Sequence, residues 1–144
     1  MAACEGAGPA RERLEVYRDE RGALTLADLD SLPFTPARVY VLHEIPAGAR
    51  RAGHAHRSQH RWLGVVSGSV EATEDDGREV STFTLNEGES RHVPPGVWHE
   101  LRALSGDVVI LAIASGPHDP ADYVHERSAM PLALVRSAEQ TPSA

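Results

Sequence analysis

The chain contains no lysine, and all 14 of its basic residues are arginine. Without a lysine amine, the protein cannot form a Schiff base to pyridoxal phosphate or to a sugar carbonyl. It has a single cysteine, Cys4, so no internal disulfide can form, and an incidental exposed thiol is the simplest interpretation. A net charge of −7 argues against broad binding of nucleic acid or of anionic membranes. This net charge is still compatible with the binding of a small anionic ligand by a few arginines.

The chain also lacks any stretch typical of a signal peptide or a transmembrane segment, which makes a reducing cytoplasm the expected compartment. Its 144 residues suit one domain. Small residues, glycine and proline dominate residues 1–10, and residues 137–144 are similar in character, so both ends are expected to be flexible. A single folded domain is therefore predicted over residues 11–136.

Between these ends, short apolar or alternating segments are separated by turn-forming residues, a pattern typical of an antiparallel sandwich or barrel. The expected strands cover residues 14–19, 23–29, 37–45, 60–68, 69–75, 79–85, 90–95, 99–104 and 107–115. The strand 69–75 should place Val70, Ala72 and Glu74 on one face. The continuous apolar run 107–115 is expected to be buried on both sides. A short helix is predicted near the C-terminus, capped by Asp119.

Three histidines, His54, His56 and His60, fall within seven residues and raise the possibility of a metal site. On a strand, His54 and His56 point to the same side, whereas His60 and Arg61 point to opposite sides. A lone histidine is more often a surface group or a satisfied core residue. A pair that directly follows a turn rich in glycine and arginine favours a functional site.

The histidine pair belongs to two longer patterns of fixed spacing. The first reads G-x5-H-x-H-x4-R-x6-G over residues 48–68, and the second reads G-x5-P-x-G-x2-H over residues 88–99. Together they resemble, position by position, the two sequence motifs of the cupin barrel. The resemblance implies an all-β fold, a small jelly-roll barrel of antiparallel strands. It also implies that His54, His56 and His99 converge on the interior.

Arg61 departs from the metal-binding members of that superfamily, which carry a glutamate ligand in its position. A guanidinium has no lone pair to donate and stays cationic, so it would repel a metal ion. Three histidines can hold zinc with one open position, and His54, His56 and His99 would be the ligands if a metal is present. The absence of metal and of any other cofactor is the favoured prediction.

The wider sequence resembles a narrower family, the cupin-type sugar 3,4-ketoisomerases. The resemblance covers about residues 15–127 and includes RGALTLADLDSLPFTPARVYVLHEIPAG, RAGHAHR, VPPGVWHEL and DPADYVHE. It implies an isomerase that acts on dTDP-4-keto-6-deoxyhexoses in deoxy- and amino-sugar biosynthesis and that forms a homodimer. Family members usually show RGxHAHK, so Ala52 and Arg57 replace a glycine and a lysine. Members commonly carry glutamine where this chain has Arg61.

Ketoisomerisation needs a base that removes the proton at C3 and an acid that returns a proton to C4. Histidine suits both tasks because its ordinary pKa is about 6.5. The resemblance points to His54 and His56 as the catalytic acid–base pair. We expect His56 to be the base at C3 and His54 the donor at C4, although the sequence itself does not rank them. His99 would orient the pair or bind a sugar hydroxyl.

The remaining candidate residues concern substrate binding. Arg61 either stabilises the developing oxyanion or pairs with an acidic neighbour such as Glu100. The resemblance places Arg38 and Tyr40 in the sugar-nucleotide pocket, with an ordinary core aromatic as the alternative for Tyr40. Trp98 should face away from the pocket. Two further arginines could bind the pyrophosphate, although a solvated face is the simpler expectation for each: Arg91 and Arg102.

Three other functions stay open beside the ketoisomerase. One is a metal-binding cupin enzyme, which Arg61 disfavours. The second is a nucleotide-sugar epimerase, which would pair a histidine with a carboxylate and a tyrosine acid. The third is a non-catalytic cupin that binds a small molecule.

Overall fold

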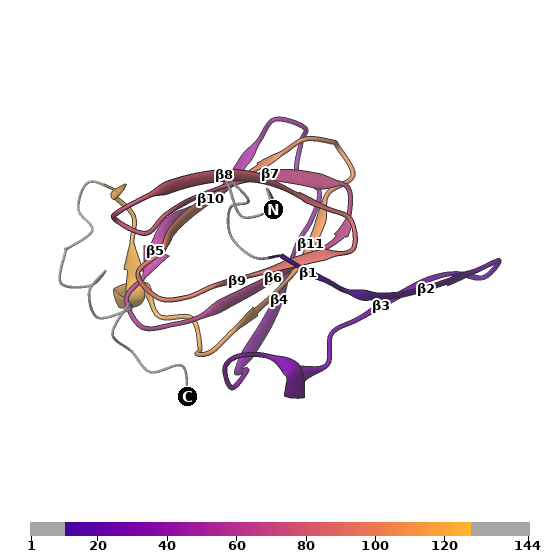
Figure 1. Ribbon diagram of the computed structural model, residues 1–144, viewed down its shortest axis with the longest axis horizontal. Coiled ribbons are helices and arrows are strands. Elements are labelled where there is room, and N and C mark those ends of the chain that lie inside the picture. The colour runs from indigo at the N-terminus through magenta and orange to yellow at the C-terminus, as the bar shows by residue number, and fades with distance from the viewer. Residues whose placement is uncertain (1–10, 128–144) are drawn as a thin grey trace, which may run out of the picture.

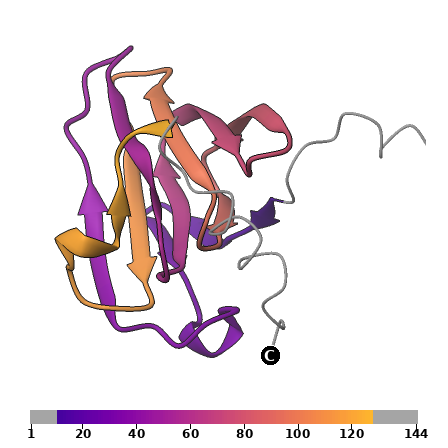
Figure 2. The same cartoon turned by 90° about the vertical axis from the view of Figure 1, so that its left-hand side faces the viewer.

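The computed structural model describes residues 11–127, which form two facing antiparallel sheets and one projecting hairpin (Figure 1). The first sheet has the order β1 (Glu12–Arg13), β9 (Glu89–Val93), β6 (Arg61–Ser67), β11 (Val109–Ala114) and β4 (Arg38–Leu42). The second has the order β12 (Tyr123–Val124), β5 (Arg50–His56), β10 (Trp98–Ala103), β7 (Ser69–Asp75) and β8 (Val80–Asn86). Figure 2 shows the molecule from the side. The predicted all-β fold of antiparallel strands is confirmed.

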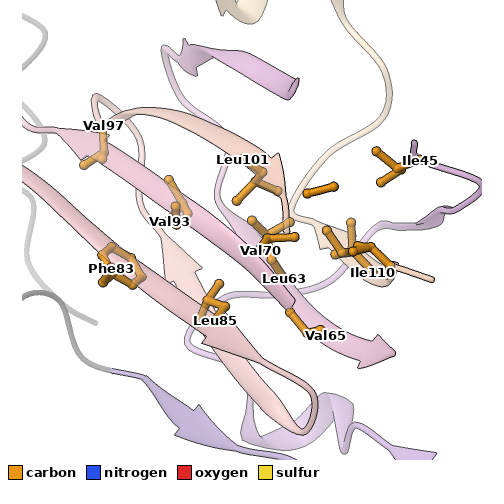
Figure 3. Close-up of a cluster of buried hydrophobic side chains, with 14 residues drawn as sticks. Ile45, Leu63, Val65, Val70, Phe83, Leu85, Val93, Val97, Leu101 and Ile110 are labelled. Atoms are coloured by element: carbon orange, nitrogen blue, oxygen red, sulfur yellow. The ribbon is translucent and has the colours of Figure 1, made fainter. Parts of the chain in front are cut away.

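Apolar side chains from both sheets meet between the layers and form the core (Figure 3). On β7, Val70, Ala72 and Glu74 are buried while Glu71 and Thr73 are half-buried, as the alternating sequence predicts. The core continues through Leu85 of β8 and Ile110 of β11, both about 1% exposed. Packing between the sheets therefore fixes the strands that carry the histidines.

The hairpin of β2 (Glu15–Asp19) and β3 (Gly22–Leu26) projects away from the barrel (Figure 1). Tyr17 and Leu24 are opposite each other in this hairpin and are 59% and 60% exposed. A two-stranded hairpin has little stability on its own in water. The exposed pair Tyr17 and Leu24 therefore needs another apolar surface to pack against.

The apolar run 107–115 is buried on both sides toward the C-terminal end of β11, so the prediction of burial on both sides holds for that part of the strand. Ile110 and Ala112 face the core, whereas on the outer face Leu111 is half-buried and Ile113 is 2% exposed. On the neighbouring β4, Val39 and Val41 are 61% and 49% exposed. The outer face of β4, with the half-buried Leu111 of β11 beside it, is thus an exposed apolar surface.

The predicted C-terminal helix is a single 3-10 turn, Pro120–Asp122. Asp119 caps it as expected, because its side chain accepts a hydrogen bond from the backbone N–H of Ala121 at 3.0 Å. The chain then enters β12, which pairs with β5, and this pairing ends the helical turn. A second 3-10 turn covers Leu29–Ser31.

Among residues 11–127 no helix has the length and apolar composition that a membrane span requires. Cys4 and the segments 1–10 and 137–144, predicted to be flexible, lie outside the described residues. The single domain over residues 11–136 stays a prediction.

Candidate active site

A β-bulge in β5 directs His54 toward the space between the sheets. His99 of β10 pairs with His54, but the next residue, Glu100, pairs with Ala52, so Gly53 is the extra residue. Ala52 and Gly53 both have positive φ, 68° and 79°. Bulges of this kind re-aim side chains beside functional sites.

His54, His56 and His99 converge, as the cupin resemblance implies. The His54 ring centroid lies 4.8 Å from that of His56 and 5.1 Å from that of His99, with nearly perpendicular ring planes. The rings of His56 and His99 are 6.1 Å apart. Strand pairing produces this arrangement, since His54 and His56 share one face of β5 and His99 lies on the adjacent strand.

All three imidazoles are held in the neutral form. Burial, followed by the positive charge of Arg61, lowers the pKa of His54 to about 4 and that of His56 to about 2. Burial is also the main cause that lowers the pKa of His99 to about 3, with His54 as the next. Neutral imidazoles are available as proton acceptors near pH 7.

Asp122 approaches His56 without forming a hydrogen bond to it. The His56 Nδ1 and Asp122 Oδ2 atoms are 3.4 Å apart, but the geometry leaves both ring nitrogens of His56 without a partner among residues 11–127. Asp122 instead accepts hydrogen bonds from the backbone and hydroxyl of Ser58 and from the backbone of Gln59. The carboxylate therefore fixes the loop between β5 and β6, and His56 keeps free lone-pair and N–H positions.

Arg61 is buried, at 1% exposure, and its guanidinium contacts neutral groups. Its partners within the described chain are Tyr40 Oη at 3.0 Å, Gln59 Oε1 at 2.9 Å, the His60 carbonyl at 3.3 Å and Tyr123 Oη at 3.5 Å. The alternative pairing with Glu100 is not formed, because Glu100 pairs with Arg50. A buried cation without a carboxylate partner is costly, and it creates a strongly positive local potential.

A cavity of about 180 Å³ lies beside these groups. Its polar lining consists of Arg38, Arg51, Tyr40, His54, His99 and Tyr123. Arg38 stacks over the Tyr40 ring at 5.0 Å, and its buried Nε has no partner within residues 11–127. His56 and Arg61 stand behind this lining. The predicted site residues are thus together, and His54 is the nearer of the two predicted catalytic histidines to the cavity.

Other predicted residues lie elsewhere. His60 is on the outer face, as expected, where its Nδ1 is 2.8 Å from His92 Nε2. Arg91 forms a bidentate ion pair with Glu74 in the interior, and Arg102 pairs with Glu71. Neither arginine is simply solvated, and both already have carboxylate partners. Trp98 packs away from the cavity, against Ala55 and Val124.

The residues fit a metal ion poorly. Within the described chain, no group of three or more histidine, cysteine, aspartate or glutamate side chains is arranged to hold one. The charge of Arg61 lowers the pKa of His54 and His56, and the same charge would oppose a cation bound to their nitrogens.

Tyr123 and His125 belong to the site but were not predicted. The Tyr123 ring centroid is 4.8 Å from that of His54 and 4.6 Å from that of His56, and His125 stacks on it at 5.6 Å. Their i, i+2 spacing in the sequence DYVHE is the same signal that identified His54 and His56. The proline and the capping aspartate before it favoured a helix instead.

A small cupin-like barrel with a histidine-lined pocket is the class that fold and site define. Residues 10–132 match the family described as "FdtA: WxcM-like, C-terminal", and the chain belongs to this family. A curated relative, the TDP-4-oxo-6-deoxy-alpha-D-glucose-3,4-oxoisomerase of Aneurinibacillus thermoaerophilus, is 32% identical over 110 residues, which cover 75% of this chain and 79% of the relative. The family predicted from the sequence motifs is confirmed.

Two solved structures are similar over most of the chain. QdtA, a sugar 3,4-ketoisomerase from Thermoanaerobacterium thermosaccharolyticum in complex with TDP, has 25% identity and a TM-score of 0.75, with coverage of 91% of this chain and 94% of that one. The WlaRB TDP-quinovose 3,4-ketoisomerase from Campylobacter jejuni has 26% identity and a TM-score of 0.74, with coverage of 88% and 96%.

Proposed function

We propose that the protein is a sugar-nucleotide 3,4-ketoisomerase, which converts the 4-keto form of a dTDP-linked 6-deoxyhexose to the 3-keto form. Family membership and the activities of the similar proteins support this reaction. The observation that carries the proposal is a pair of neutral histidines, His54 and His56, beside a small cavity and an unneutralised buried arginine. The mechanism uses no metal.

The chemistry is a proton transfer through an enediolate. One imidazole of the pair takes the proton from C3, and a proton is then delivered to C4. His54 lines the cavity and His56 lies behind it, which favours His54 as the group that meets the reacting carbons. This reverses the order that we expected from the sequence. His56, 4.8 Å away between ring centroids, would exchange protons with it, and His99 would orient the ring of His54.

The cavity volume matches a sugar ring rather than a whole nucleotide sugar, since complete ligand pockets are usually about 300–1,000 Å³. The nucleotide would therefore extend beyond it. Arg38 and Arg51 line the cavity, and neither has a carboxylate partner within residues 11–127. We assign them to the pyrophosphate in place of Arg91 and Arg102, because guanidinium groups bind phosphate oxygens in a bidentate manner.

A homodimer is part of the same proposal. The hairpin exposes Tyr17 and Leu24, and the outer face of β4 and β11 exposes Val39 and Val41 beside a groove of about 500 Å³. The projecting hairpin needs apolar cover, and an uncovered apolar face of this kind is typical of an interface. In a homodimer, a second copy of this chain covers both the hairpin and the outer face of β4 and β11.

Incubation with TDP-4-keto-6-deoxyglucose in deuterated water tests the reaction by NMR. We expect a new 3-keto sugar that carries solvent deuterium at C4. His54→Asn and His56→Asn should each reduce the rate at least about 100-fold, because general acid–base groups contribute about 10²–10⁴-fold. His43→Asn, at an exposed position of the loop after β4, is the matched control and should keep full activity.

Three results would contradict the proposal. An inverted carbon centre with the ketone still at C4 would indicate an epimerase. Binding without turnover or exchange would indicate a non-catalytic protein. Stoichiometric metal in the active enzyme, together with loss of activity on its removal, would replace the metal-free mechanism.

A further inference from the structure

The side chain of Gln59 lies between the buried Arg61 and the segment that follows β11. Its Oε1 accepts a hydrogen bond from Arg61 Nη1 at 2.9 Å, and its Nε2 donates one to the carbonyl oxygen of Pro117 at 2.8 Å. Gln59 is 9% exposed, so both hydrogen bonds are largely shielded from water. A single amide therefore joins the buried cation to the chain that leads toward β12.

An amide matches both of these partners. A guanidinium only donates hydrogen bonds and the Pro117 carbonyl only accepts them, so the bridging group needs an acceptor at one end and a donor at the other. The Gln59 amide has this polarity and carries no charge. An ionised glutamate would place an anion against the guanidinium and would offer no donor to Pro117. The amide thus holds Arg61 in place without compensating its positive charge.

Gly116 leaves the space that this bridge occupies. The His60 N–H donates to Ser115 Oγ at 2.9 Å and the Ser115 N–H donates to the His60 carbonyl at 3.2 Å, so the two segments run side by side. Gly116 is buried there, and a Cβ on it would lie 2.7 Å from Gln59 Nε2 and 2.9 Å from Gln59 Cδ. Its φ is not positive, so its backbone accepts an alanine. The Gln59 amide, rather than a turn, therefore requires glycine at this position.

The position of Arg61 matters for the proposed reaction because of its charge. The guanidinium is close enough to lower the pKa of both His54 and His56. An enediolate carries a negative charge that the substrate does not, so a fixed cation stabilises the enediolate more than the substrate. An interaction of this kind raises kcat and leaves KM nearly unchanged.

We propose that Gln59 is a positioning residue for the reaction: its amide holds the uncompensated Arg61 cation at the pocket, and a side chain at position 116 would displace that amide. Neither Gln59 nor Gly116 is among the residues that line the cavity. This inference rests on the proposed ketoisomerase function and extends the site to two residues that act through Arg61.

Gly116→Ala tests the bridge without altering any residue that lines the cavity. The variant should lower kcat for TDP-4-keto-6-deoxyglucose by about 10- to 100-fold with KM nearly unchanged, because a small misplacement of a group that acts on the reacting centre reduces rates by factors of this size. Gly106→Ala is the matched control, since Gly106 is exposed, has no positive φ and has no atom within 4 Å of an added Cβ. It should keep the wild-type kcat.

A double-mutant cycle with Gln59→Ala shows whether Gly116 acts through the amide. Gln59→Ala should lower kcat by a similar factor, and Gly116→Ala should have no further effect once Gln59 is alanine. Gln59→Glu should instead move the acid limb of the kcat/KM profile to higher pH, because its carboxylate offsets the charge that keeps the pKa of His54 and His56 low. Gln59→Ala leaves the charge of Arg61 uncompensated and should keep the limb at low pH.

The outcomes separate the role of Gln59 from the proposed function. A wild-type protein that neither isomerises the sugar nor exchanges solvent deuterium would remove the proposed function, and this inference with it. An active wild type would overturn the role of Gln59 alone if Gly116→Ala kept its kcat or if the two kcat losses multiplied in the double variant. An acid limb that stays in place in Gln59→Glu would do the same. Thermal unfolding of each variant checks that the assays report on the folded barrel.

Discussion

Ala52 has a φ of 68°, in the left-handed region, within the bulge that directs His54. This conformation destabilises a residue with a Cβ by roughly 1–2 kcal/mol, whereas glycine adopts it without this penalty. Glycine also loses more chain entropy on folding, which offsets part of the gain. Ala52→Gly should therefore raise the free energy of unfolding by about 1 kcal/mol, as measured by urea denaturation.

Ala72→Gly on β7 is the control for this change, since Ala72 has no positive φ and is buried in the core. It should lower the free energy of unfolding by about 0.5–1 kcal/mol or more, because glycine weakens a strand interior. A decrease for both variants would show that the conformation of Ala52 carries no strain. The family resemblance marked Ala52 as a mild replacement of glycine, and the backbone angle shows what that replacement costs.

Arg61→Gln should move the acid limb of the kcat/KM profile to higher pH. The base acts only when deprotonated, so activity falls as the pH drops through its pKa. Burial is the first cause and Arg61 the second cause of the low pKa of His54 and His56. Removal of the cation raises both pKa values, while burial keeps them below the ordinary 6.5. The wild-type limb should lie near pH 5 or below, and the variant limb above it.

Arg61→Lys retains the charge and is the matched control for this profile. Its acid limb should stay at low pH, although kcat should fall because one ammonium group cannot reproduce the planar fork that reaches two phenols. An unchanged limb in Arg61→Gln would show that the arginine does not set the histidine pKa. Far-ultraviolet circular dichroism at each pH confirms that the profile reports on folded enzyme.

The outer face of strands β4 and β11 should form the dimer interface. Val39 is 61% exposed on the outer face of β4, where the proposed partner subunit packs. Val39→Glu buries a charge in that interface, so we expect a shift from dimer to monomer in analytical ultracentrifugation. Val80→Glu, at a position on β8 that is 56% exposed, should leave the dimer intact. A wild-type monomer, or equal behaviour of the two variants, would contradict the interface.

The sequence predicted most elements because local chemistry specifies them. Alternation placed Val70 and Ala72 in the core, and the glycine-containing turns separated the strands of both sheets. The continuous apolar run 107–115 predicted burial on both sides, and the monomer buries the outer face of β11 at Ile113 but only partly at Leu111. The sequence does not specify how far the neighbouring segments extend over that outer face.

β12 was missed because tertiary contacts, rather than local preference, form it. Tyr123 and Val124 are too few for a strand signal, and they become one by pairing with His56 and Ala55 of β5. Asp119 and Pro120 correctly predicted a capped turn but not its length. Motif spacing placed His54, His56 and His99, whereas the hydrogen-bond partners of Arg61 depend on where three separate segments meet: β4, residues 59–61 and β12.

The molecule as a whole is expected to lose stability when the pH falls from 7 to 5. Burial lowers the pKa of His54 and His92 to about 4, of His99 to about 3 and of His56 to about 2. The unfolded chain binds these protons near pH 6.5 and the native state does not, so the stabilisation is complete above 6.5 and is lost as the pH falls toward the native values. Carboxylates with a lowered pKa, such as Asp75 and Asp107, change the stability only at lower pH.

His56 and His99 are 2% and 3% exposed, so solvent screening reduces their contribution least. Each of these two histidines should lower the free energy of unfolding by about 1.4 kcal/mol for every pH unit that the pH falls between 6.5 and the native pKa. At pH 5 the loss should be about 2 kcal/mol for each histidine. Urea denaturation at pH 7 and pH 5 measures the difference. His99→Gln should flatten the dependence, because glutamine does not titrate, while His43→Gln at an exposed position should keep the wild-type slope. Equal stability at the two pH values would mean that the site histidines take up protons in the folded barrel, and the neutral acid–base pair would then be lost as the basis of the mechanism.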